Sequence, residues 1–206
     1  MDTDKLQSLR WAGAALAGAA VLAAVLMHYH PHGDDTATQI RVSHGALLLL
    51  IAIQPAVLGL VARALGWNLL TALALAFFVF GTLGALLAGT INGFVVPAMW
   101  AYPDGEIAPG VTDLAWQMNQ ALATLGAISA GTGIALFGAA LWRADWRIIG
   151  GVGLFVGAMS AGLLVVGVTD MQFEGAILTY VAQLLWLAAL GVRLFRLASV
   201  SSPSNP

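Results

Sequence analysis

Apolar residues along this chain form six long runs, and polar residues are concentrated in the breaks between them. A helix needs roughly 20 residues to cross the hydrocarbon core of a bilayer. The runs cover residues 11–27, 45–62, 69–100, 114–141, 148–168 and 175–190. This pattern predicts an all-α membrane protein, a six-helix transmembrane bundle that forms one domain over residues 1–198. We expect the polar tail at 199–206 to be disordered.

Composition supports this interpretation. The chain is 60% hydrophobic and only 9% charged, with a mean hydropathy of +0.88, whereas charged residues make up about 25% of soluble domains. It has no cysteine, which excludes disulfides, thiolate metal ligands and cysteine nucleophiles. We expect the lipid bilayer to be its main environment, with a membrane-protein partner or a homo-oligomer as further partners and no nucleic acid.

The third run carries small residues at every fourth position, which on a helix form one smooth face. They are Gly81, Ala85, Gly89 and Gly93. Such a face lets a neighbouring backbone approach closely within a membrane. Asn92 lies at the edge of this face, and Pro97 follows one turn later. We therefore predict that the third helix is central in the bundle and bent between Gly89 and Pro97, where a proline interrupts the helical hydrogen bonds.

The charged residues are sorted between the two ends of the predicted bundle. All lysines and arginines except Arg41 fall on the side of the two termini, and most carboxylates fall on the other side. Because cytoplasmic loops carry an excess of Lys and Arg, both termini are predicted to be cytoplasmic. The abundance of Ala and Gly and the short loops suggest a bacterial inner (plasma) membrane.

Polar residues near the second run fix the expected depth of two side chains. Ser43 is suited to cap the second helix, which would place His44 in its first turn at the outer boundary. Gln54 would then lie about 15 Å deeper, close to the bilayer midplane. Pro55 follows it directly.

All four histidines precede or begin the second run, on the outer side. They are His28, His30, His32 and His44. Imidazoles beside carboxylates such as Asp34 and Asp35 can bind zinc, copper or nickel, so a divalent metal is one candidate cofactor. A haem held by a loop histidine and His44 is a narrower version of this hypothesis. The alternative is that these histidines bind no ligand and are only polar residues of a hydrated loop at the membrane interface.

None of the six runs has a charged residue near its middle, which disfavours proton pumps, voltage sensors and many ion-coupled transporters. Several uncharged or rim-located polar residues remain as candidate walls of a ligand pocket. They are Gln54, Asn92, Asn119, Gln120 and Glu174. Acidic residues at the rim, such as Glu174, are also explained by the helix dipole.

Three functions are therefore compatible with the sequence, and it does not decide whether the protein is an enzyme. The first is a small structural or accessory membrane subunit, which the small-residue faces favour. The second is a metal- or haem-binding protein or metalloenzyme at the outer face. The third is binding or transport of a lipid or small uncharged molecule.

The absence of cysteine makes the predicted orientation testable by labelling. Single cysteines at Asp35, Gly105 and Gln172 should react with an impermeant thiol reagent added outside intact cells, whereas cysteines at Gly66 and Ala144 should react only after permeabilisation. The reverse pattern would show that the termini are outside.

Overall fold

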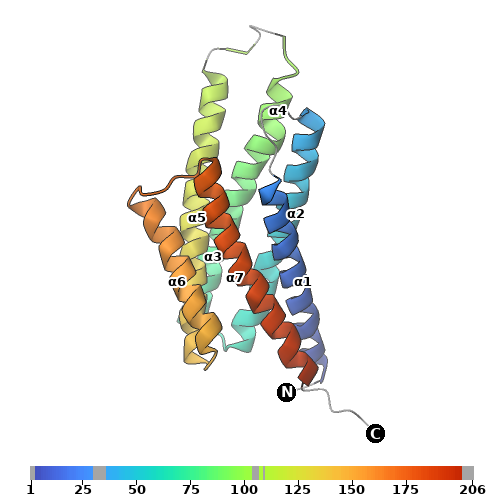
Figure 1. Ribbon diagram of the computed structural model, residues 1–206, viewed down its shortest axis with the longest axis vertical. Coiled ribbons are helices and arrows are strands. Elements are labelled where there is room, and N and C mark those ends of the chain that lie inside the picture. The colour runs from blue at the N-terminus through green and yellow to red at the C-terminus, as the bar shows by residue number, and fades with distance from the viewer. Residues whose placement is uncertain (1–2, 30–35, 104–106, 109, 201–206) are drawn as a thin grey trace.

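The computed structural model describes residues 3–29, 36–103, 107–108 and 110–200, and long helices form nearly all of it (Figure 1). The elements are α1 (Thr3–His28), α2 (Ala37–Ala64), α3 (Leu69–Thr90), the π-helix η1 (Ile91–Val95), α4 (Val96–Met99), α5 (Val111–Arg143), α6 (Arg147–Val165) and α7 (Phe173–Val200). Because α3, η1 and α4 are continuous, the described residues contain six helices long and apolar enough to cross a membrane. The predicted six-helix, all-α fold is confirmed.

The start of α1 and the end of α7 lie at one end of the bundle, together with the links from α2 to α3 and from α5 to α6 (Figure 1). We call this the terminal end and the opposite one the distal end. Arg63 and Arg143 lie in the last turns of α2 and α5, and Arg147 begins α6. The basic residues therefore gather at the terminal end, as their order in the sequence predicted.

The packing of α3, α5 and α6 depends on glycines that let their backbones meet. A Cβ atom added at Gly84 would lie 2.7 Å from the Cα of Gly126, and one added at Gly131 would lie 2.9 Å from the carbonyl oxygen of Gly157. Both distances are too short for a real side chain. Of the six spans, α5 has the largest buried share, because α3 packs along one side of it and α6 along another.

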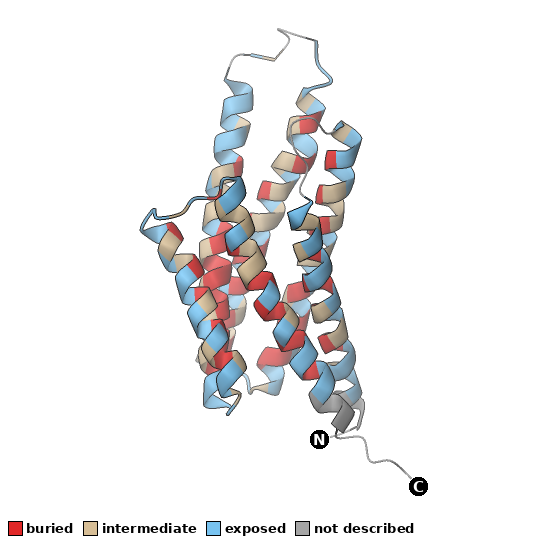
Figure 2. Cartoon of the chain, in the orientation of Figure 1, coloured by how far each residue is buried: buried red, intermediate tan, exposed pale blue. Residues whose placement is uncertain are grey.

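A second close contact joins α1 and α7. A Cβ at Gly13 would lie 2.6 Å from the carbonyl oxygen of Gly191. In contrast, α5 and α7 contact each other at few places. Trp186 on α7 is buried and donates a hydrogen bond to the carbonyl of Ile149 on α6 at 2.9 Å. Figure 2 shows that the buried residues of α5 gather toward the terminal end, so the distal half of α5 is covered less by neighbouring helices.

The predicted start of the second helix is wrong. Its N-cap is Thr36 rather than Ser43, and the helix begins at Ala37. Thr36 accepts a hydrogen bond from the Gln39 backbone at 3.3 Å, and the Gln39 side chain accepts one from the Thr36 backbone at 2.9 Å. This reciprocal capping satisfies two backbone donors. His44 therefore lies two turns inside the helix and is buried, whereas the sequence placed it at the boundary.

The bend predicted between Gly89 and Pro97 coincides with a change of helix type. The α-helix gives way to the π-helix η1 at Ile91–Val95, directly before Pro97. The proline ring clashes with the carbonyl four residues earlier and supplies no N–H. A wider turn relieves that clash, which explains why the π-helix lies here. In contrast, α2 continues through Pro55 without interruption.

The close contact at Gly84 should make this glycine indispensable for stability. Gly84→Ala should lower the free energy of unfolding by about 1–3 kcal/mol, because backbone atoms of α5 block the added methyl group. Gly18→Ala is a matched control, since nothing lies within 4 Å of a Cβ there. It should be neutral or stabilise the helix by up to about 1 kcal/mol. Unfolding in mixed detergent micelles, followed by circular dichroism, measures both. Equal stability of the two variants would contradict the contact.

Candidate functional site

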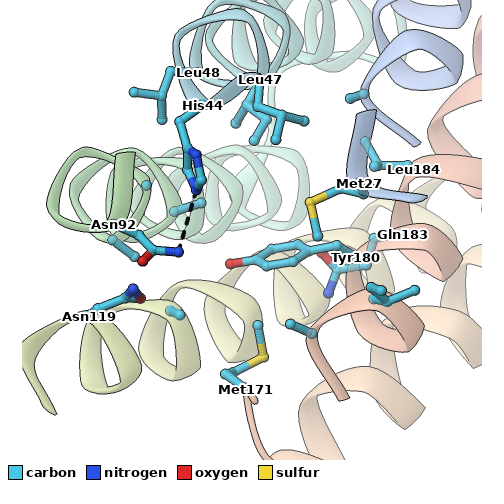
Figure 3. A pocket seen from close by; sticks show the side chains of 18 of the residues that line it. Met27, His44, Leu47, Leu48, Asn92, Asn119, Met171, Tyr180, Gln183 and Leu184 are labelled. Carbon is cyan, nitrogen blue, oxygen red and sulfur yellow. Dashed lines mark hydrogen bonds between the residues drawn. The ribbon is translucent and has the colours of Figure 1, made fainter. Parts of the chain in front are cut away.

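A cavity of about 300 Å³ lies between α1, α2, α3, η1, α5 and α7 (Figure 3). Its polar lining residues are His44, Gln54, Asn92, Asn119, Gln120, Tyr180 and Gln183. Apolar side chains such as Met27, Leu47 and Leu184 make up most of the remaining wall. No Asp, Glu, Lys or Arg lines the cavity among the described residues. It is therefore an uncharged pocket within the membrane-spanning part of the bundle.

Hydrogen bonds to α2 itself and to η1 help to hold His44 in the cavity wall. Its Nδ1 lies 2.9 Å from the carbonyl oxygen of Ile40, and its Nε2 lies 3.4 Å from Nδ2 of Asn92. A carbonyl oxygen can only accept, so Nδ1 carries a proton and donates it. Nε2 of the neutral ring then accepts from the Asn92 amide. Figure 3 shows this bond between α2 and η1 as a dashed line.

The π-helix and a glycine make the contact with His44 feasible. A Cβ atom at Gly93 would lie 2.6 Å from Cγ of His44, so only glycine leaves room for the imidazole ring. The neighbouring Asn92 then lies beside that ring and reaches its Nε2. π-helical turns often occur at functional sites, and here the turn carries the polar side chain into the cavity wall.

Three further polar residues lie near the distal end of the cavity: Asn92, Asn119 and Tyr180. Together with His44, we call them the distal polar group. They come from η1, α5 and α7. Asn119 is 6% exposed, and its side chain has no hydrogen-bond partner among the described residues. In Figure 3 the hydroxyl of Tyr180 points toward the two asparagines. An oxygen-bearing molecule between them could bond to amide and hydroxyl groups from three helices.

Gln54 lies deeper in the cavity and is 3% exposed. Its amide nitrogen is buried without a hydrogen-bond partner in the described residues. Gln183 differs, because its Nε2 donates to the carbonyl of Ala127 at 3.3 Å. A buried polar group left unpaired costs about 1–3 kcal/mol. A molecule that bonds to Gln54 recovers that cost.

The structure brings most of the sequence-predicted pocket residues together. Four of the five line the cavity, and Glu174 does not. Glu174 is exposed and lines a shallow groove formed by the link between α6 and α7 and the start of α7. His44, predicted as a metal ligand, lies in the cavity wall instead of at the surface.

Tyr180 was missed by the sequence analysis. Its signal is a phenol in the second turn of the last span, three residues before Gln183. Residues three apart lie on the same helix face, and Gln183 faces the bundle interior. This pair indicates a polar strip along one face of an otherwise apolar run.

The histidine metal hypothesis stays a prediction. His28 is exposed at the end of α1 and contacts Tyr29 edge to face, with ring centroids 5.1 Å apart. His30 and His32 lie outside the described residues. Within the described part of the chain, no three His, Cys, Asp or Glu residues are grouped so that they could hold a metal ion.

Comparison with known proteins adds no functional assignment. The chain matches no protein-family model, no curated protein and no solved structure. Function must therefore be inferred from the chemistry of the cavity.

The hydrogen bonds of His44 predict its tautomer. ¹⁵N NMR of histidine-labelled protein at neutral pH should show a neutral His44 ring with the proton on Nδ1. The signal is assigned by its loss in His44→Gln. Asn92→Leu should leave the proton on Nδ1, because the Ile40 carbonyl still accepts it. A proton on Nε2, or on both nitrogens, would contradict the geometry.

Proposed function

We propose that this multi-pass membrane protein binds a small uncharged molecule inside the bundle. The observation that carries the proposal is the cavity of about 300 Å³ with amide, imidazole and phenol groups in its wall. Ligand pockets have volumes of about 300–1,000 Å³ and combine apolar walls with a few polar groups. The cavity fits this description at its lower limit.

The lining favours an uncharged ligand over an ion. A charged group inside a membrane protein needs a compensating charge or strong coordination, and no Asp, Glu, Lys or Arg of the described residues lines the cavity. The amides and the hydroxyl offer both donors and acceptors. Because Leu47, Leu184 and their neighbours cover most of the wall, the ligand needs an apolar body with a few oxygen or nitrogen atoms.

Access from the distal end is supported by two aromatic residues. Trp116 on α5 and Phe173 on α7 line the cavity and are 45% and 48% exposed. We infer that the cavity opens to the surface of the bundle between these helices. If the termini are cytoplasmic, as the arginines of the terminal end favour, the ligand enters from the outer face or the outer leaflet. We place the protein in a bacterial inner membrane on composition alone.

The accessory-subunit function has less support. It rested on small-residue faces that a partner could contact, but those faces pack inside the bundle. Gly81 and Gly84 contact α5, and Gly93 contacts α2. These glycines are therefore explained by internal packing, and they no longer argue for a partner.

Filling the cavity should abolish binding. Ala88 is 5% exposed and lines the cavity, whereas its neighbour Leu87 is 46% exposed on the outer surface of the bundle. Protein purified in mild detergent should carry a copurifying uncharged molecule, detected by extraction and mass spectrometry. Ala88→Phe should reduce its amount at least about tenfold, and Leu87→Phe should not.

A second variant keeps the test conclusive even if Ala88→Phe does not fold. Asn119→Leu keeps the size of the side chain but removes its ability to hydrogen-bond to the ligand. It should therefore weaken binding by about fivefold, the effect of one hydrogen bond of about 1 kcal/mol. Absence of any bound molecule from the wild-type protein, or an equal load in all four proteins, would refute the proposal.

A further inference from the structure

The cavity has hydrogen-bonding groups at two depths. His44 and Gln54 line it from the same helix, ten residues apart along an uninterrupted α2. At 1.5 Å per residue, their Cα atoms are separated by about 15 Å along the helix axis. His44 belongs to the distal polar group, so one set of polar side chains lies near the mouth and Gln54 lies at the deep end.

Along α2, the wall between these two depths is apolar. Leu47, Leu48 and Ile51 follow one another along α2 between His44 and Gln54, and all three line the cavity. Ala88 on α3 and Leu184 on α7 contribute further apolar surface. A ligand that fills the cavity therefore meets polar, apolar and polar surroundings in that order.

The deep end needs a partner for Gln54 that the protein does not provide. The Gln54 amide is buried, and its nitrogen has no partner among the described residues. A hydroxyl both donates and accepts, so it can pair with either atom of the amide.

An ordinary single-headed lipid does not satisfy both ends. With its headgroup at the distal polar group, its methyl end would lie against Gln54 and leave the amide unpaired. With the headgroup at Gln54, the chain would cover Asn119 and Tyr180 instead. A small polar solute would leave the apolar wall uncovered.

We propose that the ligand is an elongated, uncharged molecule with an oxygen-bearing group at each end and an apolar middle. The inner oxygen bonds to Gln54, and the outer oxygen bonds to Asn119 and Tyr180. Terminally oxygenated hydrocarbon chains and terpenoids with oxygens at both ends belong to this class. This inference rests on the proposed function, because it specifies the ligand of the same cavity.

Two probes of equal chain length test the inference. Decane-1,10-diol has a hydroxyl at both ends, and decan-1-ol has one. Binding of each to purified protein in lipid nanodiscs is measured by native mass spectrometry and by thermal stabilisation. The diol should bind about fivefold to tenfold more tightly, the effect of one additional hydrogen bond.

Substitutions at Gln54 identify the deep contact. Gln54→Leu should lower the affinity for the diol to that for decan-1-ol and leave decan-1-ol unaffected. Gln117→Leu is the matched control, because it makes the same chemical change at an exposed position outside the cavity, and it should keep the preference for the diol.

The outcomes separate this inference from the proposed function. Two results would contradict the inference of a ligand with oxygen at both ends: equal binding of both compounds by the wild-type protein, or a preference for the diol that Gln54→Leu keeps. In either case the proposed binding of uncharged molecules would still stand. If the wild-type protein binds neither compound, both proposals are overturned.

Discussion

Close approach of helix backbones at glycine is the constraint on which the rest of this structure depends. Lipid tails are as apolar as the side chains that face them, so helices in a bilayer associate through packing. Gly84 and Gly126 bring α3 against α5, and Gly13 and Gly191 bring α1 against α7. Trp186 joins α7 to α6 nearer the terminal end. The contact between α5 and α7 is sparse, and the cavity lies beside it.

The polar wall of the cavity depends on the same kind of constraint. Pro97 favours a π-helix before it, and Gly93 within that π-helix leaves room for the ring of His44. His44 in turn can bond to Asn92 because α2 begins at Ala37, directly after its Thr36 cap, and carries the ring into the bundle. The proposed binding of an uncharged molecule thus depends on a series of steric conditions, and it needs no ionised group.

Much of the fold could be predicted because membrane helices are specified by long apolar runs, which are local in sequence. The start of α2 was also encoded locally, in the Thr36 and Gln39 capping pair. The prediction chose Ser43 instead, because it lies immediately before the apolar run. The cavity is different. The three-residue spacing places Tyr180 and Gln183 on one face of α7, but whether that face meets lipid or the interior depends on how α7 rotates against α1. Polar residues within apolar runs still identified Gln54 and Asn119, since they are costly to expose to lipid.

Direct observation of the cavity is the most decisive measurement. An electron cryomicroscopy map of the protein in native-lipid nanodiscs, with a rigid binding fragment to add mass, should show continuous elongated density. It should extend from the Gln54 amide to the space between Asn119 and Tyr180. A cavity closed by the surrounding side chains, with the Gln54 amide bonded to another protein group, would contradict ligand binding at this site.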